Sequence, residues 1–482
     1  MRLSIKFLYK KALVALLILS LSGCKLMTPL PQKAPIETPR TFLERMDSAS
    51  IGGMKVSEFF TDPNLVALID TALQRNQDIA MAFQRIEMAR AHLWEREAAL
   101  LPTVGGEAAG GTRRYGEFTQ EGVGNYDANF SDNVRPDQRM SNPLPEYFLG
   151  VRSSWEVDIW GKLRTRRRAA VLRFMASEKA RQLVVTNIVA EVARLYYELL
   201  TLDSELEIIE RNRILQKAAL ETIVIQKEAG RANELAVRQF TAQLLNTQTL
   251  AIRIEQQIME DENRMNLLLG RYTQPITRGA SILEQKLPEE IGVGVPALML
   301  RHRPDVQQAE LELRAYEADL QSARLAFLPS LTISPFLALN SFSSAALFNP
   351  GSIAFALLGG VTVPLINRKP LKAGQRRAQA QATEALFNYN KTVLTAYQET
   401  ALNLRTLDNM QKIAVLKELE TTALQQGVSI SNDLFLAGLA TYLEVITAQR
   451  SVLEAELEQT TIQQRRFQTL VSLYRSLGGG WE

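Results

Sequence analysis

Apolar and polar residues alternate one by one in four short stretches of the chain. The clearest stretch covers about 147–159, where Val151, Trp155 and Val157 alternate with Arg152, Ser154, Glu156 and Asp158, and Leu149 continues the apolar positions. Successive side chains of a strand point to opposite faces, so this pattern predicts a strand with one apolar face. The other three stretches predict strands over about 103–115, 330–341 and 353–365.

Long runs without Gly or Pro lie between these stretches and are rich in good helix formers. The run 162–229 would form a helix of roughly 100 Å if unbroken, and comparable runs cover 64–101 and 375–426. Within the first run, apolar residues recur at alternating spacings of four and three, which is the heptad seam of coiled-coil packing. The seam consists of Ile188, Val192, Leu195, Leu199, Leu202, Leu206 and Ile209.

The order helix, strand, strand, helix, helix occurs twice. The triplets "LLP" (100–102) and "FLP" (327–329) each end a helix and open a strand pair, and "AGRANEL" (229–235) is echoed by "AGLATYL" (437–443). An internal duplication is the simplest account. It divides the chain into a first repeat over 62–269, a connector over 270–300, a second repeat over 301–477 and a C-terminal tail over 478–482.

Each repeat supplies two strands long enough to cross a membrane, because roughly 9–11 tilted residues span the hydrocarbon layer. Four strands would leave two open edges, whose unpaired N–H and C=O groups are too costly in lipid. If these strands span a membrane, several chains must therefore share one barrel. Two copies give eight strands and a barrel filled by side chains, whereas three give twelve and room for a lumen. The polar stretches 116–146 and 343–351 are then external loops.

The N-terminus has the pattern of a lipoprotein signal peptide over residues 1–23. Four basic residues precede the apolar run "ALVALLILSL", which is too short for a permanent membrane helix and ends in "LSGC". This ending resembles a bacterial lipobox, so we expect cleavage before Cys24 and lipid on its sulfur and its new amino terminus. The alternative is an ordinary signal peptide with a chance Cys, which is disfavoured because Cys24 is the only cysteine of the chain.

Charge and residue counts argue against several classes of protein. Removal of residues 1–23 takes the formal net charge from +3 to about −1, so the basic balance gives no reason to expect a nucleic-acid partner. One cysteine excludes an intramolecular disulfide, and His92 and His302 lie too far apart in sequence to suggest a metal site. The sequence offers no nucleophile–base pair and no phosphate-binding loop. We therefore expect neither an enzyme nor a bound cofactor.

Six motifs spread over essentially the whole chain point to one family. They are the lipobox at Cys24, "WEVDIWGKLR" (155–164), "LLLGRY" (267–272), "RHRPDVQQAELELRAYEADLQSARLAFLPSLTIS" (301–334), "YLEVITAQRSVLEAELE" (442–458) and "SLGGGW" (476–481). Together they resemble the TolC-like outer membrane factor family, and specifically its lipoprotein branch in RND-type efflux systems (NodT-type lipoproteins).

The resemblance implies a mainly helical fold with membrane strands. Three chains would form a homotrimer with one twelve-stranded outer-membrane β-barrel, four strands coming from each chain, continued by a long periplasmic helical barrel with coiled-coil packing. The segment 24–61 would wrap the periplasmic part. The implied partners are outer-membrane lipid, a periplasmic adaptor (membrane fusion) protein and an inner-membrane transporter of the RND type. The implied function is efflux of drugs or other toxic small solutes.

The resemblance also places a periplasmic gate in the helix after the "AGLA" turn. By position the gate residues are Leu443, Thr447 and Arg450, with Leu443 as the apolar constriction. Asp often stands in the family where this chain has Thr447, and Glu444 could restore that negative charge, although a shift of one residue turns a side chain about 100° around the helix. The alternatives are that Glu444 is solvated and that Arg450 pairs with Glu454 on its own helix.

Two turns between long helices are candidate contacts for the adaptor, because exposed tips are what a partner helix would reach. Their glycines also permit the backbone angles of a turn. The candidate residues are Gly230 and Arg231 in the first turn, and Gly438 and Leu439 in the second.

Two other functions remain open from the sequence. One is a type I-like channel that exports a protein or peptide, since the cargo is chosen mainly by the inner-membrane component. The other is a structural coiled-coil envelope lipoprotein, which explains Cys24 and the heptads but leaves the one-faced strands without a purpose.

Overall fold

The computed structural model describes residues 39, 41–42, 50–286 and 292–481. The expected signal peptide, Cys24 and most of the segment 24–61 lie outside the described residues. The chain divides into two compact units, of which the first contains 91–172 and 314–384, and the second contains 173–313 and 385–482 together with the described residues before 91.

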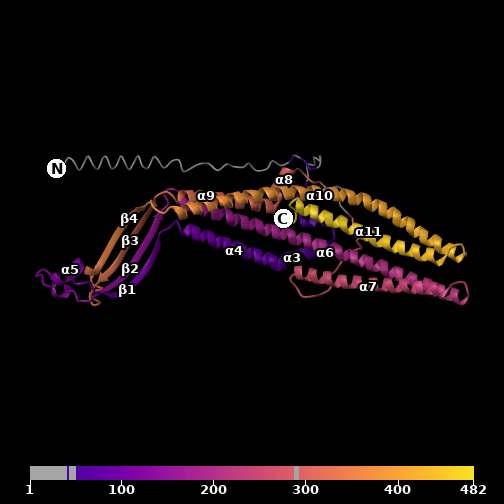
Figure 1. Ribbon diagram of the computed structural model, residues 1–482, viewed down its shortest axis with the longest axis horizontal. Helices are drawn as coiled ribbons and strands as arrows, with labels where there is room; N and C mark the ends of the chain where they lie inside the picture. The colour runs from indigo at the N-terminus through magenta and orange to yellow at the C-terminus, as the bar shows by residue number, and fades with distance from the viewer. Residues whose placement is uncertain (1–38, 40, 43–49, 287–291, 482) are drawn as a thin grey trace. The chain divides into compact units, whose positions relative to one another are not determined.

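Helices account for most of the described chain (Figure 1). None of them is both long enough and apolar enough to cross a bilayer, among the residues that the structure describes. In chain order they are α2 (Val56–Phe59), α3 (Pro63–Arg75), α4 (Gln77–Ala98), α5 (Gln120–Ala128), α6 (Lys162–Glu228), α7 (Glu234–Leu268), α8 (Pro296–His302), α9 (Pro304–Leu325), α10 (Lys369–Leu436) and α11 (Tyr442–Ser476), with short 3₁₀ turns at Ile51–Gly53, Pro136–Gln138 and Pro350–Ser352.

The first unit contains one antiparallel sheet in the order β1-β2-β3-β4 (Figure 1). The strands are β1 (Thr103–Arg113), β2 (Leu144–Val157), β3 (Ser330–Ser341) and β4 (Ile353–Thr362). All four predicted strands are present, and only the ends differ. β2 begins at Leu144 rather than at 147, because its ladder with β1 extends to the pair Arg113–Leu144.

The predicted external loop over 116–146 contains local structure that the sequence analysis did not predict. It contains α5 and a 3₁₀ turn, and Thr119 caps α5 by accepting a hydrogen bond from the Gly122 N–H at 3.1 Å. The apolar residues of α5 are too few to have signalled a helix, so the cap is the feature that defines it.

The long helices follow the predicted runs with two corrections. α6 is unbroken over 67 residues, whereas the run 64–101 divides into α3 and α4 at Asn76. There the Asn76 side chain accepts hydrogen bonds from the N–H groups of Asp78 and Ile79 and starts a new helix. α10 extends well beyond 375–426 because Gly374 and Gly427 are tolerated inside it.

The core of the second unit is built on the predicted heptad seam. Six of the seven seam residues of α6 are buried, and Leu206 packs against them half-buried. Near the C-terminus, Tyr474 of α11 stacks on Phe59 with ring centroids 4.0 Å apart. Gly479 packs so closely on the Tyr474 ring that a Cβ there would lie 2.2 Å from it, which explains a glycine in "SLGGGW".

The described residues before α3 pack onto this second unit. Phe42 is fully buried and stacks on Tyr397 of α10, and Ser50 forms a bridge with Val293 in the connector. Asp62 then caps α3 and accepts a 2.6 Å hydrogen bond from the buried hydroxyl of Tyr196 on α6.

Candidate functional site

The four strands place most of their large apolar residues on one face of the sheet. Residues paired across neighbouring strands share a face, and the registers align Leu149 with Leu339 and with Ile353. Phe355 and Leu357 on this face are 79% and 76% exposed in the single chain. The apolar face comprises Val104, Ala108, Tyr147, Leu149, Val151, Trp155, Val157, Leu331, Ile333, Leu337, Leu339, Ile353, Phe355, Leu357 and Val361.

The opposite face of the sheet carries charges that are paired with one another. Arg152 on β2 forms an ion pair with Glu107 on β1 at 2.5 Å, and its guanidinium lies over the rings of Phe148 and Phe336. Such a sheet has one face suited to an apolar medium and one suited to water.

Both outer strands of this sheet have an unpaired edge within the described chain, because β1 pairs only with β2 and β4 only with β3. Each free edge presents a row of N–H and C=O groups that can pair with another strand. The sheet is therefore a segment that further strands can extend on both sides.

The turn between α6 and α7 is held by its glycine and by a helix cap. Gly230 adopts φ +71°, a left-handed conformation that favours glycine. Asn233 caps α7 by accepting a hydrogen bond from the Ala236 N–H at 2.9 Å. Lys227 donates a hydrogen bond to Glu234 across the turn, which holds the pKa of that carboxyl below its usual value. Arg231 is exposed at this tip.

The turn between α10 and α11 has the same design. Gly438 adopts φ +75°, and Leu439 beside it is 77% exposed. Thr441 and Glu444 form a capping box at the start of α11, in which the Glu444 carboxylate accepts a hydrogen bond from the Thr441 N–H. This hydrogen bond gives Glu444 a structural role as part of the N-terminal cap of α11.

The structure places the expected gate residues within the first turns of α11. Leu443 is 55% exposed, and the Thr447 hydroxyl donates to the Leu443 carbonyl oxygen at 2.7 Å. Arg450 pairs with Glu454 at 2.8 Å, as one sequence alternative suggested, and both side chains are exposed in the single chain. Leu443, Thr447 and Arg450 recur at helical spacing on one side of α11.

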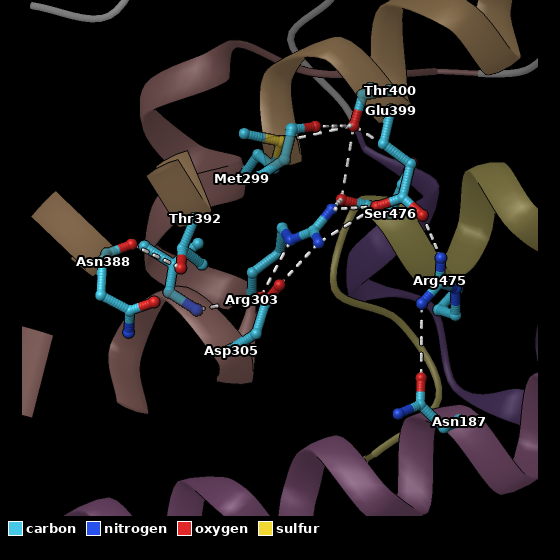
Figure 2. Close-up of polar contacts among 12 residues, drawn as sticks. Asn187, Met299, Arg303, Asp305, Asn388, Thr392, Glu399, Thr400, Arg475 and Ser476 are labelled. Atoms are coloured by element: carbon cyan, nitrogen blue, oxygen red, sulfur yellow. Dashed lines mark hydrogen bonds and ion pairs between the residues drawn. The ribbon is translucent and has the colours of Figure 1, made fainter. Parts of the chain in front are cut away.

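A buried charge cluster in the second unit was missed by the sequence analysis (Figure 2). Arg303, between α8 and α9, is 6% exposed and forms a bidentate pair with Asp305 at 2.7 and 3.0 Å. It also donates to Glu399 of α10 at 3.1 Å and to the Ser476 carbonyl oxygen at the end of α11 at 2.8 Å. Arg475 also forms an ion pair with Glu399, so two guanidinium groups contact this carboxylate.

Burial acts to lower the pKa of Arg303, but its hydrogen bonds and attraction to Asp305 and Glu399 outweigh this and raise the pKa above its usual value. The cluster joins the connector end of the second repeat to both of its long helices. In the sequence, only Arg303 and Asp305 of "RHRPD" are neighbours; the other partners of Arg303, Glu399 and Ser476, lie about 100 and 170 residues further along the chain.

Among the described residues, no group of three His, Cys, Asp or Glu side chains could hold a metal ion.

Comparison with known proteins agrees with this geometry. The sequence model of a family described as outer membrane efflux protein matches residues 68–271 and 295–479. The chain is 28% identical over 480 residues to the solvent efflux pump outer membrane protein SrpC of Pseudomonas putida, covering 98% of each chain. It is 26% identical to the probable outer membrane lipoprotein SilC of Salmonella typhimurium, covering 96% of this chain and 97% of SilC.

The fold is also similar to that of a solved channel. The open state of the MtrE outer membrane channel of Neisseria gonorrhoeae superposes with a TM-score of 0.81 at 23% identity, covering 95% of this chain and 98% of MtrE. At this identity the likeness concerns the fold alone.

Proposed function

Because this chain belongs to the outer membrane efflux protein family, we propose that three copies form one conduit that carries small solutes out of the cell through the outer membrane. The observation that carries this proposal is the four-stranded sheet with one apolar face and two free edges. An edge is not stable in lipid until it is paired. Three sheets joined edge to edge, β4 of one chain to β1 of the next, close a twelve-stranded barrel with room for a lumen.

The proposal includes a lipid anchor and a division of the chain. Residues 1–23 act as the signal peptide and Cys24 carries lipid, which the likeness to the lipoprotein SilC supports. The segment 24–61 wraps the helical part, and the repeats 62–269 and 301–477 each contribute two strands and two long helices.

The partners follow from the same proposal. Three copies of α6, α7, α10 and α11 form a periplasmic tunnel, and its tips at Gly230, Arg231, Gly438 and Leu439 meet the helical hairpins of a periplasmic adaptor. An inner-membrane transporter of the RND type delivers the cargo. Small toxic solutes fit this role, since SrpC is a component of a solvent efflux pump.

Native mass spectrometry of protein extracted from membranes in mild detergent tests the assembly. We expect a trimer in which each chain begins at Cys24 and carries diacylglycerol and an acyl chain. A monomer that is stable across detergents would leave the sheet edges unpaired and would refute the shared barrel. A stable dimer would allow only a closed eight-stranded barrel filled by side chains, and would refute the twelve-stranded conduit. A trimer without lipid mass would refute only the anchor.

The gate is the second part of the proposal. We propose that Leu443 narrows the tunnel tip and that Arg450 tethers α11 to a neighbouring helix in the trimer. The combined change Leu443→Gly and Arg450→Ala should then raise single-channel conductance in planar bilayers several-fold, because it widens the constriction and releases the tether. Glu454→Gln, which removes the ion pair of Arg450 with its own helix but not the hydrogen-bond acceptor, is the matched control and should leave conductance near that of the wild type. Equal conductance for all three proteins would argue against a gate at this position.

The charge of Glu444 can be separated from its capping role. Glu444→Gln keeps a side chain that completes a capping box but removes the negative charge. If three Glu444 carboxylates form an acidic ring at the tip, the variant should lose part of the channel's preference for cations in reversal-potential measurements under a salt gradient. Unchanged selectivity with an unchanged melting temperature would show that Glu444 acts only as a cap.

A further inference from the structure

A cavity of about 290 Å³ lies within the second unit, lined by all four long helices near their tips. Phe435 and Leu436, the last residues of α10, and Val445, in the first turn of α11, belong to its wall. α6 contributes Gln216 and Ile223, together with further residues towards its C-terminal end.

Two glutamine side chains in this cavity wall lack hydrogen-bond partners. Gln216 is 1% exposed, and neither its Oε1 nor its Nε2 has a partner in the described chain. Gln449 of α11 is 9% exposed, and its Oε1 is likewise unpaired. Buried amide groups are nearly always hydrogen-bonded, so three unpaired atoms at one cavity indicate a missing partner.

The charged groups nearby are already paired, which limits what this partner can be. Asn212, also in the wall, donates to the Glu456 carboxylate at 3.3 Å. Glu456 itself is held by Arg211 at 3.2 Å and by Gln425 at 2.8 Å. A charged ligand would find no free counter-charge among these residues, so a neutral one fits better.

Most of the remaining wall is apolar, although Thr222 and Asn432 also line it. Ile223, Phe240 and Val445 are each 1% exposed and pack together in one buried cluster. A ligand that fills the cavity must therefore present hydrogen-bonding atoms to the glutamines and an apolar group to this cluster, the usual composition of a small-molecule site.

From this match we propose that the cavity is a binding site for a small neutral carboxamide with an apolar substituent. The three unpaired atoms are two acceptors, Oε1 of Gln216 and of Gln449, and one donor, Nε2 of Gln216. A primary amide offers the complement, two N–H donors and one carbonyl acceptor. Its apolar group then occupies the space beside Phe240. This site is independent of the efflux function proposed above.

Benzamide is the test ligand, because it joins a primary amide to one aromatic ring. We expect it to raise the melting temperature of the full-length protein in detergent in a saturable manner, by about 1–2 °C at concentrations well above a dissociation constant on the order of 1 mM. Toluene, which lacks the amide, should give less than half of that shift. Gln216→Leu and Gln449→Met should each abolish saturation by benzamide without lowering the melting temperature of the free protein.

Gln257→Leu on the exposed side of α7 is the matched control and should bind benzamide like the wild type. Two results would overturn the proposal. The first is the absence of a saturable shift in the wild type, which would mean that the cavity holds only water. The second is an equal shift in the wild type and in both glutamine variants, which would reflect partitioning into detergent or into another site. Should one variant fail to fold, the other still decides between these results.

Discussion

Replacing Arg303 by alanine is expected to lower the free energy of unfolding of the second unit by about 3–5 kcal/mol, the usual cost of breaking a buried ion pair from one side. The change removes a guanidinium that is 6% exposed and that pairs with Asp305 and Glu399. It also leaves the Ser476 carbonyl oxygen at the end of α11 without its donor. Arg475 still faces Glu399, but no cation replaces Arg303 at Asp305.

The measurement is the thermal unfolding of the purified protein followed by circular dichroism, together with the yield of assembled protein. Arg301→Ala is the matched control, because Arg301 lies on the neighbouring α8, is exposed, and should be nearly neutral. Arg303→Lys should recover only part of the loss, since an ammonium group cannot reproduce the two-pronged contact with Asp305. A normal melting temperature for Arg303→Ala would show that the cluster contributes little net stability.

Local patterns in the sequence predicted the elements that depend on local physics. The period of two at Leu149, Val151 and Trp155 predicted a one-faced strand, and the registers align that face across all four strands. The heptad spacing from Ile188 to Ile209 predicted a coiled-coil packing seam, and six of its seven residues are buried in the second unit, with Leu206 half-buried. In both cases the spacing of apolar residues along the element determines which of its side chains share the apolar face.

The sequence analysis missed contacts between residues far apart in the chain. It also missed helix boundaries that are set by a single polar capping residue. Asn76 ends one helix and starts another without any Gly or Pro, and Thr119 starts α5 in a stretch predicted only as an external loop. The Arg303 cluster and the unpaired amide of Gln216 depend on which helices pack together. The spacing of residues within one segment does not predict that packing. The gate residues were assigned by their position in the family motif. The structure adds their local contacts, such as the ion pair of Arg450 with Glu454.

Introducing a charge on the apolar face of β4 should remove the protein from the outer membrane. Leu357 is 76% exposed on that face, opposite Pro335 of β3. If the apolar face contacts lipid, Leu357→Arg costs about 2–4 kcal/mol for each chain when the residue lies near the middle of the bilayer. A trimer would bear this cost three times, which is enough to prevent stable assembly.

The control is the next residue of the same strand. Leu358→Arg makes the same chemical change on the opposite face, where Leu358 lies across from Ser334 of β3 and is 60% exposed. That face would line a water-filled lumen, so the variant should still reach the outer membrane as a trimer. The readout is the amount of trimer in isolated outer membranes, resolved by electrophoresis without heating. Loss of Leu358→Arg with retention of Leu357→Arg would mean that the sheet faces lipid with its other side, and equal retention of both would mean that β4 does not lie in the hydrocarbon layer. Only loss of Leu357→Arg alone fits a barrel whose apolar exterior is the face on which all four strands align.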